Sequence, residues 1–163
     1  MKKVKTEIYS RIIRSLSELQ KAAHHLRYEQ SMLEYTLSRL KRDPKPLNLE
    51  FAMLMESFLI HTRNLNGFFY GWELSNEENK RLLKNDVIVE DYFEKEHPWN
   101  KPQNCRIPTE LRHRIDQQLA HITFGREIGH YGDWNFTGMY NNIMTLFYSF
   151  NNSVDPEKIK KIY

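Results

Sequence analysis

Arg114 and His121 lie seven residues apart in the segment ELRHRIDQQLAHITFGRE, and their side-chain types suit metal-free chemistry on RNA. On a helix this spacing makes about two turns, so both side chains would lie on one face. The histidine titrates near neutral pH and could move a proton at the 2′-hydroxyl or at the leaving oxygen. The arginine is a permanent cation and could stabilise the charge of the phosphorane. We therefore predict Arg114 and His121 as catalytic residues.

The same pair also has a structural interpretation, because arginine and histidine at helical spacing are common. In that interpretation Arg114 is solvated and His121 packs against neighbouring helices. Gln117 and Gln118 sit between the two residues, and Arg126 follows them. We predict that these three polar side chains bind substrate.

His61 and Arg63 form a second candidate site within a predicted apolar helix. His61 falls on or beside the apolar stripe, and a buried polar group needs hydrogen-bond partners. It could bond the third predicted helix, or complete a substrate-binding site with Arg63 and Glu56. The alternative is a core histidine whose hydrogen bonds are satisfied, with Arg63 paired to a carboxylate.

A run of acidic residues provides the third candidate, a site for Mg²⁺ or Mn²⁺. Its members are Asp86, Glu90, Asp91, Glu94, Glu96 and His97. Their spacing matches no known metal signature, so a solvated turn is the better interpretation. The single cysteine, Cys105, excludes a Cys-rich zinc site and an internal disulfide. We predict neither metal ligands nor a cofactor.

Two long helices are predicted from apolar residues that recur at alternating steps of three and four, over residues 7–41 and 47–70. The first pattern skips one position, at Gln30. Thr6 is a start signal for the first helix, and Asp43-Pro44 is its stop signal. Asn48 could cap the second helix and Gly71 could end it. The short link between them predicts an antiparallel hairpin.

The pattern breaks over residues 72–107, where we expect a short helix from Asn76 to Leu83, an extended turn at 86–89 and an irregular loop anchored by Trp99. The remaining predicted elements are a third helix capped by Thr109, a fourth capped by Asp133 and reaching about residue 150, and a short tail helix that begins at Asp155-Pro156. Residues 1–163 are thus predicted to form one all-α domain. The expected architecture is an antiparallel four- to five-helix bundle with a long irregular loop between the second and third long helices.

Composition limits the class of protein. Of the residues, 40% are hydrophobic, which excludes general disorder. The basic start, MKKVKTEIYSRIIRS, lacks the apolar core of a signal peptide, and no window approaches the ~20 apolar residues of a membrane span. We therefore expect a cytoplasmic protein. A net charge of +3 permits contact with RNA without arguing for it.

Three fragments and the Arg–His pair together resemble an uncharacterised bacterial branch of the HEPN superfamily. The fragments are LEFAMLMESFLIHTRNLNGFF, DVIVEDYF and RIDQQLAHITFGR, and the resemblance covers about residues 20 to 150. It implies a four- or five-helix homodimeric domain, and Arg114 and His121 match the superfamily's motif pair. Many members are ribonuclease toxins or defence effectors. The next residue here is Ile115, where active members usually have a polar residue.

Two hypotheses about function follow. In the first, the protein is a HEPN-like, metal-independent endoribonuclease that acts in defence or as a toxin. In the second, the same helical domain is a non-catalytic module that binds RNA, a nucleotide or a protein partner. The co-facing pair favours the first hypothesis, and Ile115 favours the second.

Overall fold

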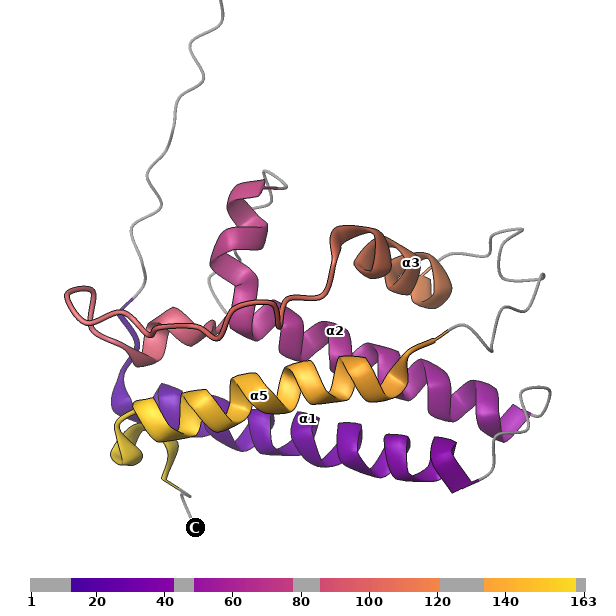
Figure 1. The fold of residues 1–163 in the computed structure, drawn as a ribbon. Helices are drawn as coiled ribbons and strands as arrows, with labels where there is room; N and C mark the ends of the chain where they lie inside the picture. Colours follow the sequence, from indigo (N-terminus) through magenta and orange to yellow (C-terminus); the bar gives the residue numbers. More distant parts are fainter. Residues whose placement is uncertain (1–12, 43–48, 78–85, 121–133, 161–163) are drawn as a thin grey trace, which may run out of the picture.

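The computed structural model describes residues 13–42, 49–77, 86–120 and 134–160 of the chain. Within these ranges all regular structure is helical and no strand occurs (Figure 1), so the predicted all-α class is confirmed. The helices are α1 (Leu16–Arg42), α2 (Leu49–Glu77), α3 (Thr109–Ala120) and α5 (Phe136–Ser153), with 3-10 turns η1 (Val89–Tyr92) and η2 (Pro156–Ile159). None of the helices in these ranges is long and apolar enough to cross a membrane.

Helix α1 begins later than its apolar spacing predicted. Ile13, Arg14 and Ser15 precede the helix, so the expectation of helix at these three positions was wrong. The cause is a capping box: the Ser15 hydroxyl accepts from the backbone N–H of Glu18 at 3.3 Å, while the Glu18 carboxylate accepts from the Ser15 backbone N–H at 2.8 Å. The predicted start signal, Thr6, lies outside the described residues.

Helix α2 continues beyond its predicted end. It passes through Gly71 and reaches Glu77, so the expectation that Gly71 ends the helix was wrong. Glycine in a helix interior costs only about 1 kcal/mol relative to alanine. Here the preceding turn is held by Phe68, Phe69 and Tyr70, which are all buried. That packing outweighs the local preference. Asn76, predicted to start a separate helix, belongs to the end of α2.

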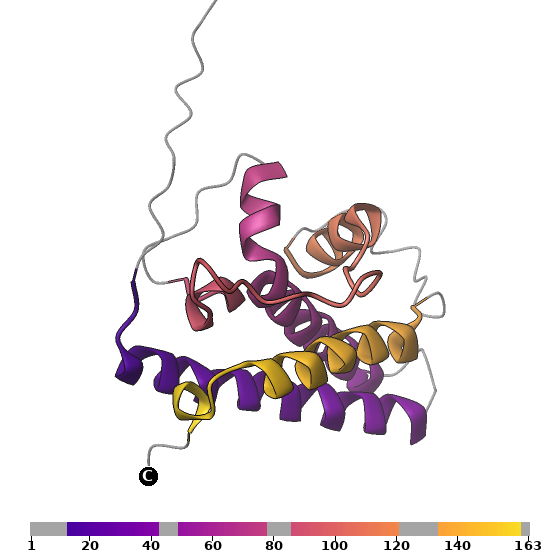
Figure 2. The same cartoon turned by 60° about the vertical axis from the view of Figure 1, so that its left-hand side comes forward.

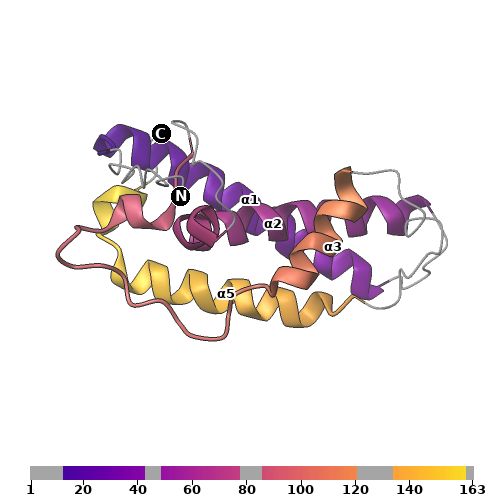
Figure 3. The same cartoon turned by 90° about the horizontal axis from the view of Figure 1, so that it is seen from above.

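Helix α5 lies along both α1 and α2, and α3 packs on α2 (Figures 1, 2 and 3). Asn135 caps α5 by accepting from the backbone N–H of Gly138 at 2.8 Å. A Cβ at position 138 would meet the Asn135 amide at 2.5 Å, so glycine makes room for this cap. The predicted cap, Asp133, lies outside the described residues. Asp155 caps η2 through the Glu157 backbone N–H, as predicted.

Aromatic rings fill the core between α2, α5 and η1. They meet edge to face, as the charge distribution of aromatic rings favours, and Phe69 and Phe147 are 5.2 Å apart at 90°. The buried rings of this cluster are Phe58, Phe68, Phe69, Tyr92, Phe147 and Phe150. Burial raises the pKa of the Tyr92 hydroxyl, which donates to the Leu19 carbonyl at 2.8 Å. The core thus ties η1 to the first turn of α1.

Residues 93–108 form the predicted irregular segment, and Trp99 anchors it. The Trp99 indole stacks on Phe93 with an interplanar angle of 8°, and its N–H donates to the Ser149 hydroxyl at 3.2 Å. At the end of the segment, the Asn66 side-chain oxygen accepts from the backbone N–H of Ile107 at 3.3 Å. These contacts fix the point from which α3 departs.

Candidate functional site

Arg114 lies on α3 with its guanidinium against an aromatic ring. Its central carbon is 4.1 Å from the centroid of Trp134, the residue that stands two positions before α5. A guanidinium at this distance from an indole face is attracted by the ring quadrupole, and the contact restrains the position of the cation. Arg114 is half-buried and Trp134 is buried. The structure therefore holds a planar cation between α3 and the start of α5.

Ile115 points the other way, into the core, and is fully buried. A polar side chain there would lose its hydration and would need a buried partner, which costs about 1–3 kcal/mol when none is present. This position on α3 therefore has a packing role.

The other predicted residues of this region are placed only in part. Gln117 is exposed and Gln118 is half-buried on α3. His121 and Arg126 lie outside the described residues. Within the described residues, the predicted site consists of Arg114 and the two glutamines, Gln117 and Gln118, that follow it on α3.

His61 on α2 is bonded to α1. Its Nδ1 lies 2.7 Å from the carboxylate of Glu29, and the Asn64 amide donates to the same carboxylate oxygen at 3.2 Å. An ionised carboxylate only accepts hydrogen bonds, so Nδ1 carries the proton and donates. The ring of Tyr28 meets the His61 ring edge to face at 5.8 Å. His61 is thus a buried histidine whose orientation is set by α1.

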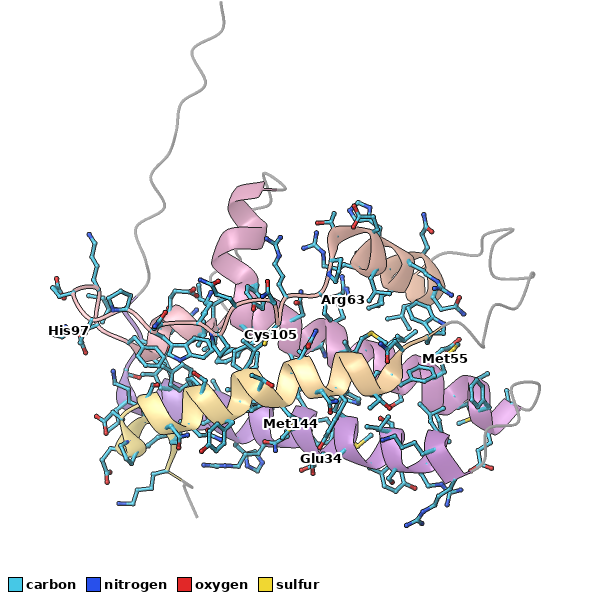
Figure 4. The ribbon with its side chains drawn as sticks, viewed as in Figure 1. Glu34, Met55, Arg63, His97, Cys105 and Met144 are labelled. Carbon is cyan, nitrogen blue, oxygen red and sulfur yellow. The ribbon has the colours of Figure 1, made fainter. Side chains whose placement is uncertain are left out.

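Arg63 has a different partner. Its guanidinium bonds the Asp116 carboxylate on α3 at 2.6 Å, and Figure 4 shows it on the side of α2 beneath α3. Both side chains of this pair are at least a third exposed, so the pair contributes at most about 1 kcal/mol. The predicted neighbours His61 and Arg63 therefore serve two different contacts, one toward α1 and one toward α3.

Glu29 was not predicted as the partner of His61, although the sequence carries a signal for it. The apolar stripe of α1 is interrupted by polar residues at Glu29 and Gln30, and the stripe of α2 is interrupted at His61. Polar interruptions on two adjacent buried faces indicate a matched pair, because each group needs a partner away from water. Only the register of α1 against α2 identifies which residues meet.

The acidic run does not gather into one cluster. Glu90 bonds Lys101 at 2.8 Å, Asp91 lies 3.6 Å from Arg14, and Glu94 lies 3.5 Å from Lys158. These carboxylates are neutralised by separate cations. In the part of the chain that the structure describes, no three side chains of metal-ligand type come together.

Neither His97 nor Cys105 adds to the α3 region. Both are labelled in Figure 4, where His97 lies at the far end of the irregular segment from α3. Burial raises the pKa of the Cys105 thiol, which disfavours the nucleophilic thiolate.

The contact between Glu29 and His61 gives a test of its strength. We expect a double-mutant cycle with Glu29→Ala and His61→Ala to give a coupling energy of about 1.5–3 kcal/mol, as for hydrogen bonds to charged groups. Urea denaturation would measure the four free energies of unfolding. The exposed pair Arg39–Glu50, 2.5 Å apart, is the matched control and should couple by less than about 1 kcal/mol. Equal coupling in both cycles would show that burial adds nothing at His61.

Arg114 is the one predicted catalytic residue whose position is described, and it lies with Gln117 and Gln118 on a helix that packs against α2. The arrangement can present a planar cation and amide groups to an anionic ligand. Comparison of the chain with models of known protein families, with curated proteins and with solved structures finds no match.

Proposed function

We propose that this chain is a HEPN-like helical protein that binds RNA at the α3 face around Arg114 and cleaves it without a metal. The observation that carries the proposal is the Arg114 guanidinium held over the Trp134 ring at 4.1 Å. A cation whose position is already restrained loses less conformational entropy when it binds a phosphate. Gln117 and Gln118 extend the same helix with groups that both donate and accept hydrogen bonds.

In the proposed reaction Arg114 and His121 have separate roles. His121 takes the proton from the 2′-hydroxyl, whose oxygen attacks the adjacent phosphorus, and a proton is returned to the leaving 5′-oxygen. Arg114 stabilises the negative charge that develops on the phosphorane oxygens. This reaction yields a 2′,3′-cyclic phosphate and a free 5′-hydroxyl. No step in it requires a metal ion.

The alternative is a non-catalytic module that holds RNA, a nucleotide or a protein partner. Ile115 favours it, because this fully buried residue stands where active HEPN members usually have a polar side chain. Both functions use the cation at Arg114. They differ in whether His121 transfers a proton.

One experiment tests the proposal directly. Purified protein is incubated with total RNA in EDTA, and binding and cleavage are measured on the same samples by gel shift and by product mapping. The proposed enzyme leaves cyclic phosphate ends. Binding without cleavage supports the module, and the absence of both contradicts each function that acts on RNA.

For the whole molecule we also propose an antiparallel four- to five-helix bundle, a cytoplasmic location and a homodimer. Two contacts support the antiparallel arrangement: Glu29 of α1 meets His61 of α2, and Arg39, further along α1, meets Glu50, nearer the start of α2. The two helices therefore run in opposite directions. The homodimer is expected from the resemblance to HEPN proteins, and any site shared by two copies would depend on it.

A further inference from the structure

Six of the eight large apolar side chains that are exposed in the described ranges lie on α1 or α2, and four of these six form two pairs with the same spacing. Tyr28 and Tyr35 are 55% and 57% exposed on α1, and Met53 and Ile60 are 63% and 42% exposed on α2. Each pair is seven residues apart, or about two helical turns, so its members share one face of their helix.

The contacts between the helices place these two pairs opposite each other. The Tyr28 ring meets the ring of His61, the residue after Ile60, at 5.8 Å. At the other end Arg39 bonds Glu50 at 2.5 Å, which brings the turn of Tyr35 beside the turn of Met53. We call Tyr28, Tyr35, Met53 and Ile60 the outer strip.

The outer strip faces away from the core. Leu33 and Phe58 are fully buried, and Tyr35 and Ile60 each stand two residues after one of them. Two residues correspond to about 200° around a helix, so the strip lies almost opposite the buried faces. Helix α5 runs along one side of the α1–α2 pair (Figure 3). The buried residues of α1 and α2 belong to the same core cluster as those of α5.

The chemistry of the outer strip is that of a protein interface. Tyrosine and methionine are enriched in interface cores, where charged side chains are depleted. The charged Arg39–Glu50 pair stands beyond one end of the strip, while Ser31, Glu56 and Ser57 lie between its two ends along the helices. The contact of Tyr28 with His61 also holds one aromatic ring in place before any partner arrives.

We propose that the outer strip is the surface through which two copies of this chain form a dimer. Each end of the strip carries one tyrosine from α1 and one aliphatic side chain from α2. The two ends of the strip are therefore alike in composition. A twofold axis in the plane of the contact, whether along the strip or across it, places an end of one copy against a similar end of the other. Such self-complementarity is what a contact between identical surfaces requires.

The exposed area is sufficient for the core of such a contact. An aromatic side chain presents about 150–250 Å², so the four partly exposed side chains leave an apolar patch on the order of 400–500 Å². Two copies would bury about twice this area, before the surrounding rim is added. Stable interfaces bury about 1,200–2,000 Å² in total, so the residues around the strip would supply the remaining area.

The inference rests on the proposed homodimer and is independent of RNA cleavage. Light scattering at tens of micromolar should give about 39 kDa for the wild type, twice the 19.7 kDa of the chain. We expect Tyr35→Lys and Ile60→Lys each to raise the dissociation constant at least tenfold, because each would bury an unpaired charge within the contact. Tyr148→Lys is the matched control, since Tyr148 is an exposed tyrosine on α5 and should leave the mass unchanged.

Circular dichroism would show that each variant keeps its helix content and melting temperature at the concentration where it is monomeric. A wild-type monomer, even at tens of micromolar, would overturn both the dimer and the strip. A wild-type dimer that Tyr35→Lys and Ile60→Lys leave intact would overturn the strip alone. RNA cleavage enters neither measurement, so the failure of the catalytic proposal would be seen separately.

Discussion

Replacing His121 with alanine is expected to lower the rate of RNA cleavage by about 10²–10⁴-fold, the typical contribution of a general acid–base group. The proposed reaction needs a group that takes up and releases a proton at neutral pH, and alanine cannot do so. The rate would be followed with a fluorescent RNA in EDTA, under single-turnover conditions. Circular dichroism would confirm that the variant keeps its fold.

His113→Ala is the matched control for this loss. His113 is an exposed histidine on α3, one residue before Arg114, and has no role in the proposed reaction. Its replacement should leave the rate unchanged within a factor of two or so. If His121→Ala cleaves as fast as the wild type, the ribonuclease proposal is wrong and the non-catalytic module takes its place.

Arg114→Lys should also lose most of the cleavage. Lysine keeps the positive charge and could still lie over the Trp134 ring, but it lacks the planar fork that grips a phosphate with two hydrogen bonds. Gel shifts with the intact RNA would separate weaker binding from slower chemistry. A variant that binds and cleaves normally would show that charge alone is used at this position.

Phe58→Ala is expected to lower the free energy of unfolding by about 3–5 kcal/mol. Phe58 is fully buried in the middle of α2, and its ring meets Phe136 of α5 edge to face at 5.2 Å. Alanine would remove the apolar area and the ring contact, and would leave a cavity that the neighbouring rings cannot fill. Urea denaturation would measure the loss.

Tyr148→Ala provides the comparison, because this side chain is 74% exposed and should cost less than about 0.5 kcal/mol. In a chain of this size, 1 kcal/mol shifts the melting temperature by about 2–4 °C, so Phe58→Ala should melt roughly 6–20 °C below the wild type. A melting temperature within a degree or two of the wild type would contradict the assignment of Phe58 to the core.

The sequence alone predicted the helical elements, because helix formation is largely encoded by neighbours three and four residues apart. The apolar spacing located most of α1 and α2, and Asp155 followed by Pro156 marked η2. Local signals also failed in particular places. The capping box of Ser15 and Glu18 begins α1 later than the apolar pattern predicted. Tertiary packing also allows α2 to continue past Gly71.

The sequence also selected Arg114, through its residue type and its distance from His121. It could not reveal that Trp134 holds the guanidinium, since the two residues are twenty positions apart and meet only when α3 and the start of α5 come together. In the same way, the sequence marked Ile115 as a difference from a motif, and burial in the core supplied the reason.

Only the tertiary structure decided which polar and apolar residues meet between α1 and α2. Periodicity assigns a residue to a face of its own helix, but the register between two helices depends on how their side chains interlock. That register pairs His61 with Glu29 and sends Arg63 to Asp116 instead. The same register brings four exposed side chains from two helices together in the outer strip. The sequence of either helix alone does not specify which residues of the other helix will lie beside it.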